Sequence, residues 1–162
     1  MIDAFLAAHS IPFTRYDHDA VFTCDDVARL VPAAAAGVQT KNLFLRDHRG
    51  RRHWLLVTTC DTAVDLKGVA PLVGADHLSL ASPERLAKFL GLTPGSVTVL
   101  GLVNDAAHAV TLVVDRAVWT ADAWRCHPLV NTATLVIATP DVRRFLAATG
   151  HEATVVDVPV RA

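Results

Sequence analysis

The stretch VQTKNLFLRD, residues 38–47, sets a lysine and an asparagine directly ahead of an apolar run. The residues LFL at 43–45 predict the start of a buried strand, beside which a charged group is costly unless it has a partner. Lys41 and Asn42 therefore mark an edge where the strand meets solvent, or they are placed to bind a ligand. The stretch also begins a pair of strands, because RHWLLVTT follows at 52–59 after a polar turn.

The rest of the chain is predicted to contain both helices and strands. Apolar spacing and capping residues predict helices over 2–9, after Thr23, over 65–74, after Ser82 and from Thr139. Strands are predicted at 77–81, 96–103, 109–118, 132–138 and 153–158, with 96–103 and 109–118 forming a pair around the turn 104–108. Strands outnumber helices and often follow one another directly. We therefore predict an α+β fold with a mixed, mostly antiparallel sheet, curled or closed into a barrel and flanked by short helices.

Length and composition indicate one globular domain over residues 1–162. The chain is long enough for a real core, and neither an internal repeat nor a linker divides it. Apolar residues make up 52% of the chain but are scattered among charged ones, so no run reaches the roughly 18 residues of a membrane span. The N-terminal residues lack the features of a signal peptide. We expect a soluble, cytoplasmic protein without a membrane partner.

The charge pattern excludes one class of partner. Formal net charge is −1, and acids and bases alternate along the whole chain. Such a chain lacks the basic surface with which a protein holds a long nucleic-acid backbone, so duplex DNA is not an expected partner. A short contact to the end of a nucleic acid is compatible with this charge.

Cysteine and histidine spacing gives no metal or disulfide motif. Cys24, Cys60 and Cys126 are an odd number at wide spacings, with no CxxC pair. We expect three reduced, mostly buried thiols. The eight histidines form neither HxxxH nor HxH, so we expect no bound metal.

Other catalytic motifs are missing, and the remaining polar residues each allow two interpretations. The chain contains no GxSxG, no P-loop and no GxGxxG. Cys126 and His127 are adjacent, and neighbours in an extended segment point in opposite directions, so they do not predict a thiol nucleophile with its base. Taken by residue type alone, 101–105 is a hairpin turn, His127 a structural histidine and Lys41 a solvated lysine.

Several motifs in one order change this assessment. The segments are TKNLFLRD (40–47), LVTT (56–59), LTPGSVTVLGLVND (92–105), CHPLVNTATL (126–135) and FLAATGHEATVVDV (145–158). Together they resemble the YbaK/ProX family, freestanding relatives of the editing domain of bacterial prolyl-tRNA synthetases. The segments are most similar to the ProX branch, which deacylates alanyl-tRNA carrying the proline anticodon. The resemblance covers nearly the whole chain.

The resemblance implies a trans-editing deacylase that hydrolyses the ester of a mischarged tRNA, with Ala-tRNA(Pro) as the expected substrate. It implies no metal, no cofactor and no covalent nucleophile, because the substrate's own ribose hydroxyl and the protein backbone orient the attacking water. Other small misacylated residues, namely 2-aminobutyryl, seryl, threonyl or cysteinyl, are alternatives. So is a non-catalytic module that binds tRNA ends or a synthetase.

The resemblance also assigns roles to residues. Lys41 would hold the phosphate next to the terminal adenosine, and Asn42 would bind the ribose or the aminoacyl group. Gly101 would let backbone N–H groups approach the ester carbonyl, and His127 would hold the substrate ammonium or the water. Secondary substrate-binding candidates are Thr40, Ser96, Leu102, Asn104 and Asn131.

The implied partners are the aminoacylated 3′ end of a tRNA and, in addition, prolyl-tRNA synthetase. A basic run between Arg46 and Arg52 follows the key strand. It either contacts the acceptor stem or is plain solvated surface, and the sequence favours neither interpretation.

Overall fold

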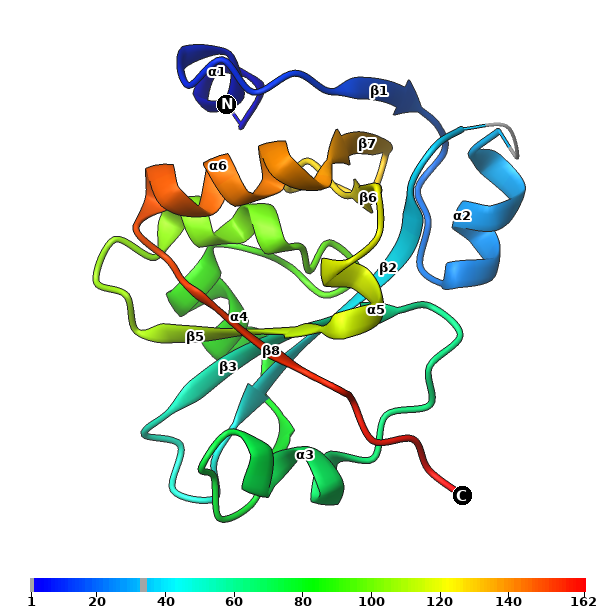
Figure 1. Ribbon diagram of the computed structural model, residues 1–162. Coiled ribbons are helices and arrows are strands. Elements are labelled where there is room, and N and C mark those ends of the chain that lie inside the picture. The colour runs from blue at the N-terminus through cyan, green and yellow to red at the C-terminus, as the bar shows by residue number, and fades with distance from the viewer. Residues whose placement is uncertain (1, 33–34) are drawn as a thin grey trace.

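The computed structural model describes residues 2–32 and 35–162 (Figure 1). Its helices are α1 (Ile2–Ala8), α2 (Cys24–Leu30), α3 (Leu66–Leu72), α4 (Pro83–Leu90), the 3₁₀ helix η1 (Val99–Asn104), α5 (Arg116–Trp119) and α6 (Thr139–Thr149). Its strands are β1 (Thr14–Asp17), β2 (Val38–Arg46), β3 (His53–Thr59), β4 (Ser79–Leu80), β5 (Val110–Asp115), β6 (Ala123–Cys126), β7 (Ala133–Ala138) and β8 (Ala153–Val156).

One curled sheet joins the strands of the described residues in the order β1-β7-β6-β2-β3-β5-β8, with β4 paired to β2 off this path. β2 runs antiparallel to β3, from Thr40 opposite Thr59 to Arg46 opposite His53, which confirms the predicted strand pair. Its first residues instead pair in parallel with β6, so β2 links the two halves of the sheet. Within the described residues β1 and β8 do not pair with each other, and the sheet is therefore open rather than a closed barrel.

The strand pairs confirm the predicted α+β class with a mixed sheet. The antiparallel pairs among the described strands are β1–β7, β6–β7, β2–β3 and β2–β4. The parallel pairs are β2–β6, β3–β5 and β5–β8. The sheet is thus mostly antiparallel by a narrow margin, and short helices cover it.

The apolar run of β2 is buried on both sides of the sheet, because successive side chains of a strand point to opposite faces. Phe44 packs into the main core with α4 and α6, while Leu43 and Leu45 pack with α3 in a second cluster. Figure 1 shows α6 on one side of β3 and β5 and α3 on the other. By the same alternation Asn42 shares the Phe44 side, and Lys41 shares the side of Leu43.

Local capping explains where several helices begin and end. The Thr23 side chain accepts from the N–H of Asp26, whose carboxylate accepts from the N–H of Thr23, and together they cap α2 as predicted. Ser82 caps α4, which ends at Gly91 with φ of +65°, a left-handed conformation that suits glycine. Thr139 was predicted to cap α6 but is its first residue, and its hydroxyl donates to the carbonyl of Ala121 instead.

The predicted strand at 96–103 is wrong. Residues 99–104 form η1, and β5 pairs in parallel with β3 and β8 instead of with that segment. The side chain of Thr98 accepts from the N–H of Leu100 and starts the helix. The Asp105 carboxylate accepts from the N–H groups of Ala109 and Val110 at 2.9 and 3.0 Å and fixes the loop before β5. Segment 96–103 is apolar because it is buried on all sides, and such a segment has the same composition as a buried strand.

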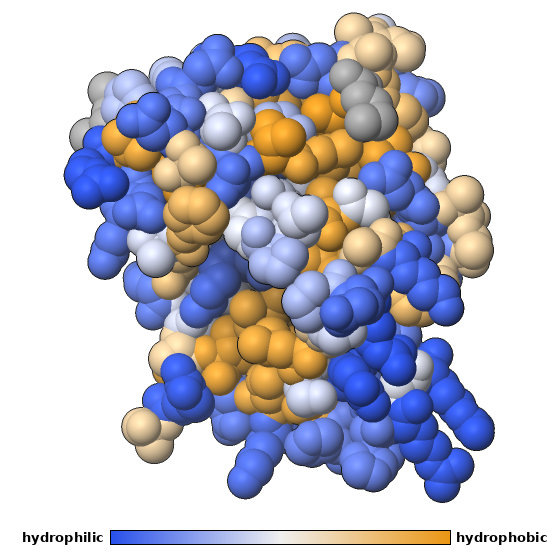
Figure 2. Space-filling view, turned by 180° about the vertical axis from the view of Figure 1, so that it is seen from behind, coloured by the Kyte–Doolittle hydropathy of each residue, from blue (hydrophilic) through white to orange (hydrophobic). Residues whose placement is uncertain are grey.

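The molecular surface carries hydrophobic residues in patches bordered by hydrophilic ones, as the face in Figure 2 shows. Large apolar side chains that are exposed are Phe22, Leu72, Leu80, Val130 and Val160. Across residues 2–32 and 35–162, no helix has the length and apolar character needed to span a bilayer.

Candidate active site

A cavity of about 360 Å³ lies between α2 and the strands β2 and β6. One wall is formed by α2 and the loop before it, and a second by residues 39–42 of β2. The rest of the lining comes from the end of β6 with His127, from the loop at 95–97, and from Cys60 and Thr134. This volume is at the lower end of the roughly 300–1,000 Å³ of small-molecule pockets.

The predicted residues Thr40, Lys41, Asn42 and His127 all line this cavity. The hydroxyl of Thr40 donates to the carbonyl of Arg125 at 2.6 Å, which ties β2 to β6. The Oδ1 atom of Asn42 is buried and has no hydrogen-bond partner among the described residues. An unpaired buried acceptor costs about 1–3 kcal/mol, so the Asn42 carbonyl is suited to a donor brought by a ligand.

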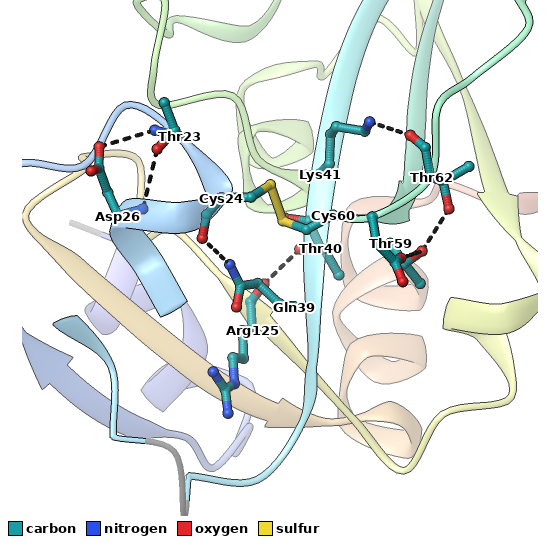
Figure 3. Close-up of a disulfide and its surroundings, with 11 residues drawn as sticks. Thr23, Cys24, Asp26, Gln39, Thr40, Lys41, Thr59, Cys60, Thr62 and Arg125 are labelled. Atoms are coloured by element: carbon teal, nitrogen blue, oxygen red, sulfur yellow. Dashed lines mark hydrogen bonds between the residues drawn. A yellow bond between two sulfur atoms is a disulfide. The ribbon is translucent and has the colours of Figure 1, made fainter. Parts of the chain in front are cut away.

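Lys41 lines the cavity, but its ammonium is bound elsewhere. Figure 3 shows its side chain leaving β2 toward the turn after β3, where Nζ donates to the carbonyl of Thr62. Burial lowers the pKa of Lys41 from its ordinary value, and the positive charge of Arg161 lowers it further, while Asp61 opposes both. The ammonium must leave Thr62 to bind any other acceptor.

His127 follows the last residue of β6 and is mostly withdrawn from solvent. Its Nδ1 lies 3.2 Å from the carbonyl oxygen of Ala133, an acceptor, so we assign the proton to Nδ1. Burial lowers the pKa of His127, the nearby His18 lowers it further, and the bond to Ala133 partly opposes this. In the neutral imidazole Nε2 is the acceptor, and no hydrogen bond from the described residues occupies it.

The other predicted residues lie away from the cavity lining or at its edge. Gly101 and Leu102 are buried in η1 against the core, and the amide of Asn104 donates to the carbonyl of Leu90 at 2.9 Å. Ser96 is buried and Asn131 donates to the carbonyl of Val21 at 2.8 Å, beside the cavity wall. The structure therefore does not bring Gly101, Leu102 and Asn104 to this cavity.

A different glycine, Gly95, lines the cavity. Its φ of +89° is readily adopted only by glycine, and a Cβ there would meet the ring of Phe22 at 3.4 Å. Phe22 stands on the cavity rim with 73% of its surface exposed. In the sequence, the dipeptide Pro94-Gly95 marks a tight turn, and this is the feature that could have pointed to Gly95 as a site residue.

The expectation of three reduced thiols is wrong. Cys24 and Cys60 form a disulfide with a Cα–Cα distance of 5.8 Å, within the usual range (Figure 3). They are 36 residues apart, and the packing of α2 beside the turn after β3 brings them together. Cys126 is the free cysteine, and burial raises the pKa of its thiol to about 12. Among the described residues no three His, Cys, Asp or Glu side chains gather as a metal site.

The arginine-rich turn lies at the far end of β2 from α2 (Figure 1). Arg46 donates to the carbonyls of Asp47 and His48, and Arg52 donates to the carbonyl of Gly74. Arg46 is about 17 Å along the strand from Lys41, at ~3.4 Å per residue. Local bonds thus occupy two of these arginines.

Comparison with known families identifies the class of protein. The model of the aminoacyl-tRNA editing domain matches residues 18–145. The chain therefore belongs to the aminoacyl-tRNA editing domain family. It is an aminoacyl-tRNA deacylase, a hydrolase of trans-editing type, which confirms the resemblance to YbaK/ProX proteins inferred from the motifs.

Individual relatives agree with this class. The chain is 36% identical to the prolyl-tRNA editing protein ProX of Acetoanaerobium sticklandii over 141 residues, which cover 87% of this chain and 85% of ProX. It is also 36% identical to the prolyl-tRNA synthetase associated domain-containing protein 1 of Danio rerio over 152 residues, 93% of this chain and 82% of that protein.

Solved structures share the fold. A crystal structure described as that of a candidate trans-editing enzyme for prolyl-tRNA synthetase superimposes with a TM-score of 0.72 at 22% identity, covering 99% of this chain and 95% of that one. The hypothetical protein APE2540 gives a TM-score of 0.75 at 20% identity, covering 97% of both chains.

Proposed function

We propose that this deacylase acts on Ala-tRNA(Pro), clearing alanine from the tRNA that should carry proline. The observation that carries the proposal is the small cavity that brings Asn42, His127 and Gly95 together beside Lys41. The similarity to ProX over most of both chains supports the choice of tRNA. We further propose that the 162 residues act as one domain in the cytoplasm, where charged tRNA is used.

The reaction is the attack of water on the aminoacyl ester. The water oxygen bonds to the carbonyl carbon, the bond from that carbon to the ribose oxygen breaks, and the ribose oxygen takes up a proton from the water and leaves as a hydroxyl. Negative charge develops on the carbonyl oxygen, where oriented backbone dipoles lower the barrier most. The lack of a side chain at Gly95 leaves backbone open to the substrate at that point.

His127 and Asn42 would orient the aminoacyl end. The Nε2 atom of a neutral His127 accepts a hydrogen bond from the substrate ammonium or from the attacking water. The unpaired Oδ1 of Asn42 accepts from a ribose hydroxyl or the same ammonium. Both are acceptors, which suits a cationic α-amino group better than an acidic ligand.

Lys41 would anchor the phosphate that precedes the terminal adenosine. Its ammonium exchanges the neutral carbonyl of Thr62 for a charged oxygen, which is the stronger acceptor. Because only one such contact is required, the net charge of −1 is no obstacle to binding a tRNA end. We propose prolyl-tRNA synthetase as a further partner, which a pull-down with the purified synthetase tests.

The decisive experiment uses the purified protein and a panel of charged tRNAs. We expect Ala-tRNA(Pro) to be hydrolysed faster than the same tRNA carrying 2-aminobutyrate, serine, threonine or cysteine. Each added group changes the free energy of transition-state binding in a small pocket by about 1–3 kcal/mol. His127→Ala should reduce the rate on Ala-tRNA(Pro). Binding of tRNA without hydrolysis across the whole panel would replace the deacylase with a binding module.

A further inference from the structure

The Cys24–Cys60 disulfide connects two parts of the proposed site that act on the substrate in different ways. Cys24 is the first residue of α2, which forms a wall of the cavity. Cys60 directly follows β3 and belongs to the turn whose Thr62 carbonyl holds the Lys41 ammonium (Figure 3). A single covalent bond therefore constrains both the cavity wall and the proposed phosphate anchor.

Other contacts hold α2 weakly. The helix has seven residues, and helices of this length are marginal without tertiary support. Its apolar support among the described residues is a small cluster in which Val21, Val27 and Val31 are buried, separate from the main core. Gln39 adds one hydrogen bond to the carbonyl of Cys24. The disulfide is thus a main attachment of this wall.

The turn that contains Cys60 is organised around Lys41. The hydroxyl of Thr59 contacts both Asp61 and Thr62 at 2.6 Å, and the N–H of Cys60 donates to the carbonyl of Gln39 at 3.0 Å. These bonds and the disulfide place the Thr62 carbonyl at the end of the Lys41 side chain. Loosening the turn would make Lys41 easier to withdraw.

A small thiol can reach the disulfide. Cys24 and Cys60 are only partly buried, and they line both the proposed site and a second hollow of about 430 Å³. Cys126 also borders the cavity, but its side chain is buried and its raised pKa disfavours the reactive thiolate. In a cytoplasmic protein disulfides are uncommon, and those present are mostly transient, in catalysis or redox sensing.

We propose that Cys24–Cys60 is a reversible thiol–disulfide modification site that restricts entry of the aminoacyl-tRNA end when oxidised and admits it when reduced. The inference rests on the proposed function. A low-molecular-weight dithiol is the reductant: its thiolate attacks one cysteine sulfur, the Cys24–Cys60 bond breaks, and a mixed disulfide forms. The second thiol of the reagent then displaces the other sulfur, which leaves two protein thiols and an oxidised reagent. Oxidation by a small disulfide is the reverse.

The test compares the protein equilibrated in reduced and in oxidised dithiothreitol, with the state of the cysteines verified by alkylation and mass spectrometry. We expect the reduced form to deacylate Ala-tRNA(Pro) about 5- to 10-fold faster at limiting substrate, at the lower end of usual coupling between sites. In Cys24→Ser and Cys60→Ser the rate should no longer depend on the redox state. Cys126→Ser removes the third thiol, which is reduced in both states, and should keep the wild-type ratio of reduced to oxidised rates whatever its effect on the basal rate.

A second readout does not depend on turnover. A non-hydrolysable amide analogue of 3′-alanyl-adenosine should bind the reduced form more tightly, and hydrogen exchange should be faster at residues 21–31 in that form. Equal affinities and equal rates in two verified redox states would overturn the switch, as would failure of the disulfide to form. Absence of hydrolysis in both states would instead refute the proposed function, and the analogue would still decide the switch.

Discussion

Replacing Lys41 by glutamine tests the phosphate anchor, because it removes the charge and keeps most of the side-chain length. In the free protein the ammonium donates to the carbonyl of Thr62. The bond from the ammonium to the Thr62 carbonyl is charged on the donor side only, whereas a bond to phosphate is charged on both sides, and we expect the exchange to gain about 1–2 kcal/mol. Losing that gain should lower kcat/KM by about 5- to 30-fold.

The assay is deacylation of Ala-tRNA(Pro) at limiting substrate over a range of salt concentrations. Loss of one phosphate contact should reduce the slope of log(kcat/KM) against log salt by about 0.7, the value for single strands. Lys67→Gln is the matched control, because Lys67 is exposed on α3 and does not line the cavity. An unchanged rate and salt slope in Lys41→Gln would refute the anchor.

Three further predictions follow from the same contacts. Burial lowers the pKa of His127, so below about pH 6.5 the unfolded chain binds the extra proton and the folded one resists it. The free energy of unfolding should therefore fall as pH drops below 6.5, and it should fall less steeply in His127→Gln than in the wild-type protein. Urea titrations in which the wild-type protein and His127→Gln show the same pH dependence would contradict this. Gly95→Ala should cost about 1–2 kcal/mol of backbone strain and should also lower kcat/KM. In Gly101→Ala the new Cβ would lie 2.7 Å from a core side chain, so this variant should lose about 1–3 kcal/mol of stability with a smaller effect on activity per folded molecule. Two variants with the same loss of activity and the same loss of stability, measured by rates and urea unfolding, would count against the Gly95 assignment. Reduction of Cys24–Cys60, which closes a span of 36 residues, should lower the free energy of unfolding by about 4 kcal/mol on the chain-entropy model, and a reduced protein as stable as the oxidised one would contradict that account.

The parts of the fold that were predictable from the sequence are those set by neighbouring residues. The strand pair from 42 to 59 follows from two apolar runs around a polar turn, and β3 is buried along almost its whole length. Thr23 and Ser82 cap helices as predicted, because a cap needs only a side chain and an N–H a few residues away. Thr40, Lys41 and Asn42 were likewise predicted as site residues from one short segment, and all three line the cavity.

The parts that were not predictable depend on contacts between distant segments. The segment 96–103 has strand composition, yet from Val99 onward it forms a 3₁₀ helix that packs in the core with α4, and only the tertiary context distinguishes the two. Cys24 and Cys60 meet because α2 lies beside the turn after β3, which no spacing rule indicates. The sequence alone does not tell which of Gly95 and Gly101 lines a cavity. Only the structure shows that Gly95 lies in the cavity wall and Gly101 in the core.

The most direct measurement is the rate at which the purified, reduced protein releases the amino acid from Ala-tRNA(Pro) and from Pro-tRNA(Pro), side by side. Both substrates share the tRNA, so the comparison isolates the cavity that holds the aminoacyl group. We predict that the alanyl ester is hydrolysed at least about 10-fold faster, since a small pocket discriminates by about 1–3 kcal/mol for each added methylene. Equal rates on the two esters, or hydrolysis of neither, would contradict the proposal that this chain removes alanine from the proline tRNA.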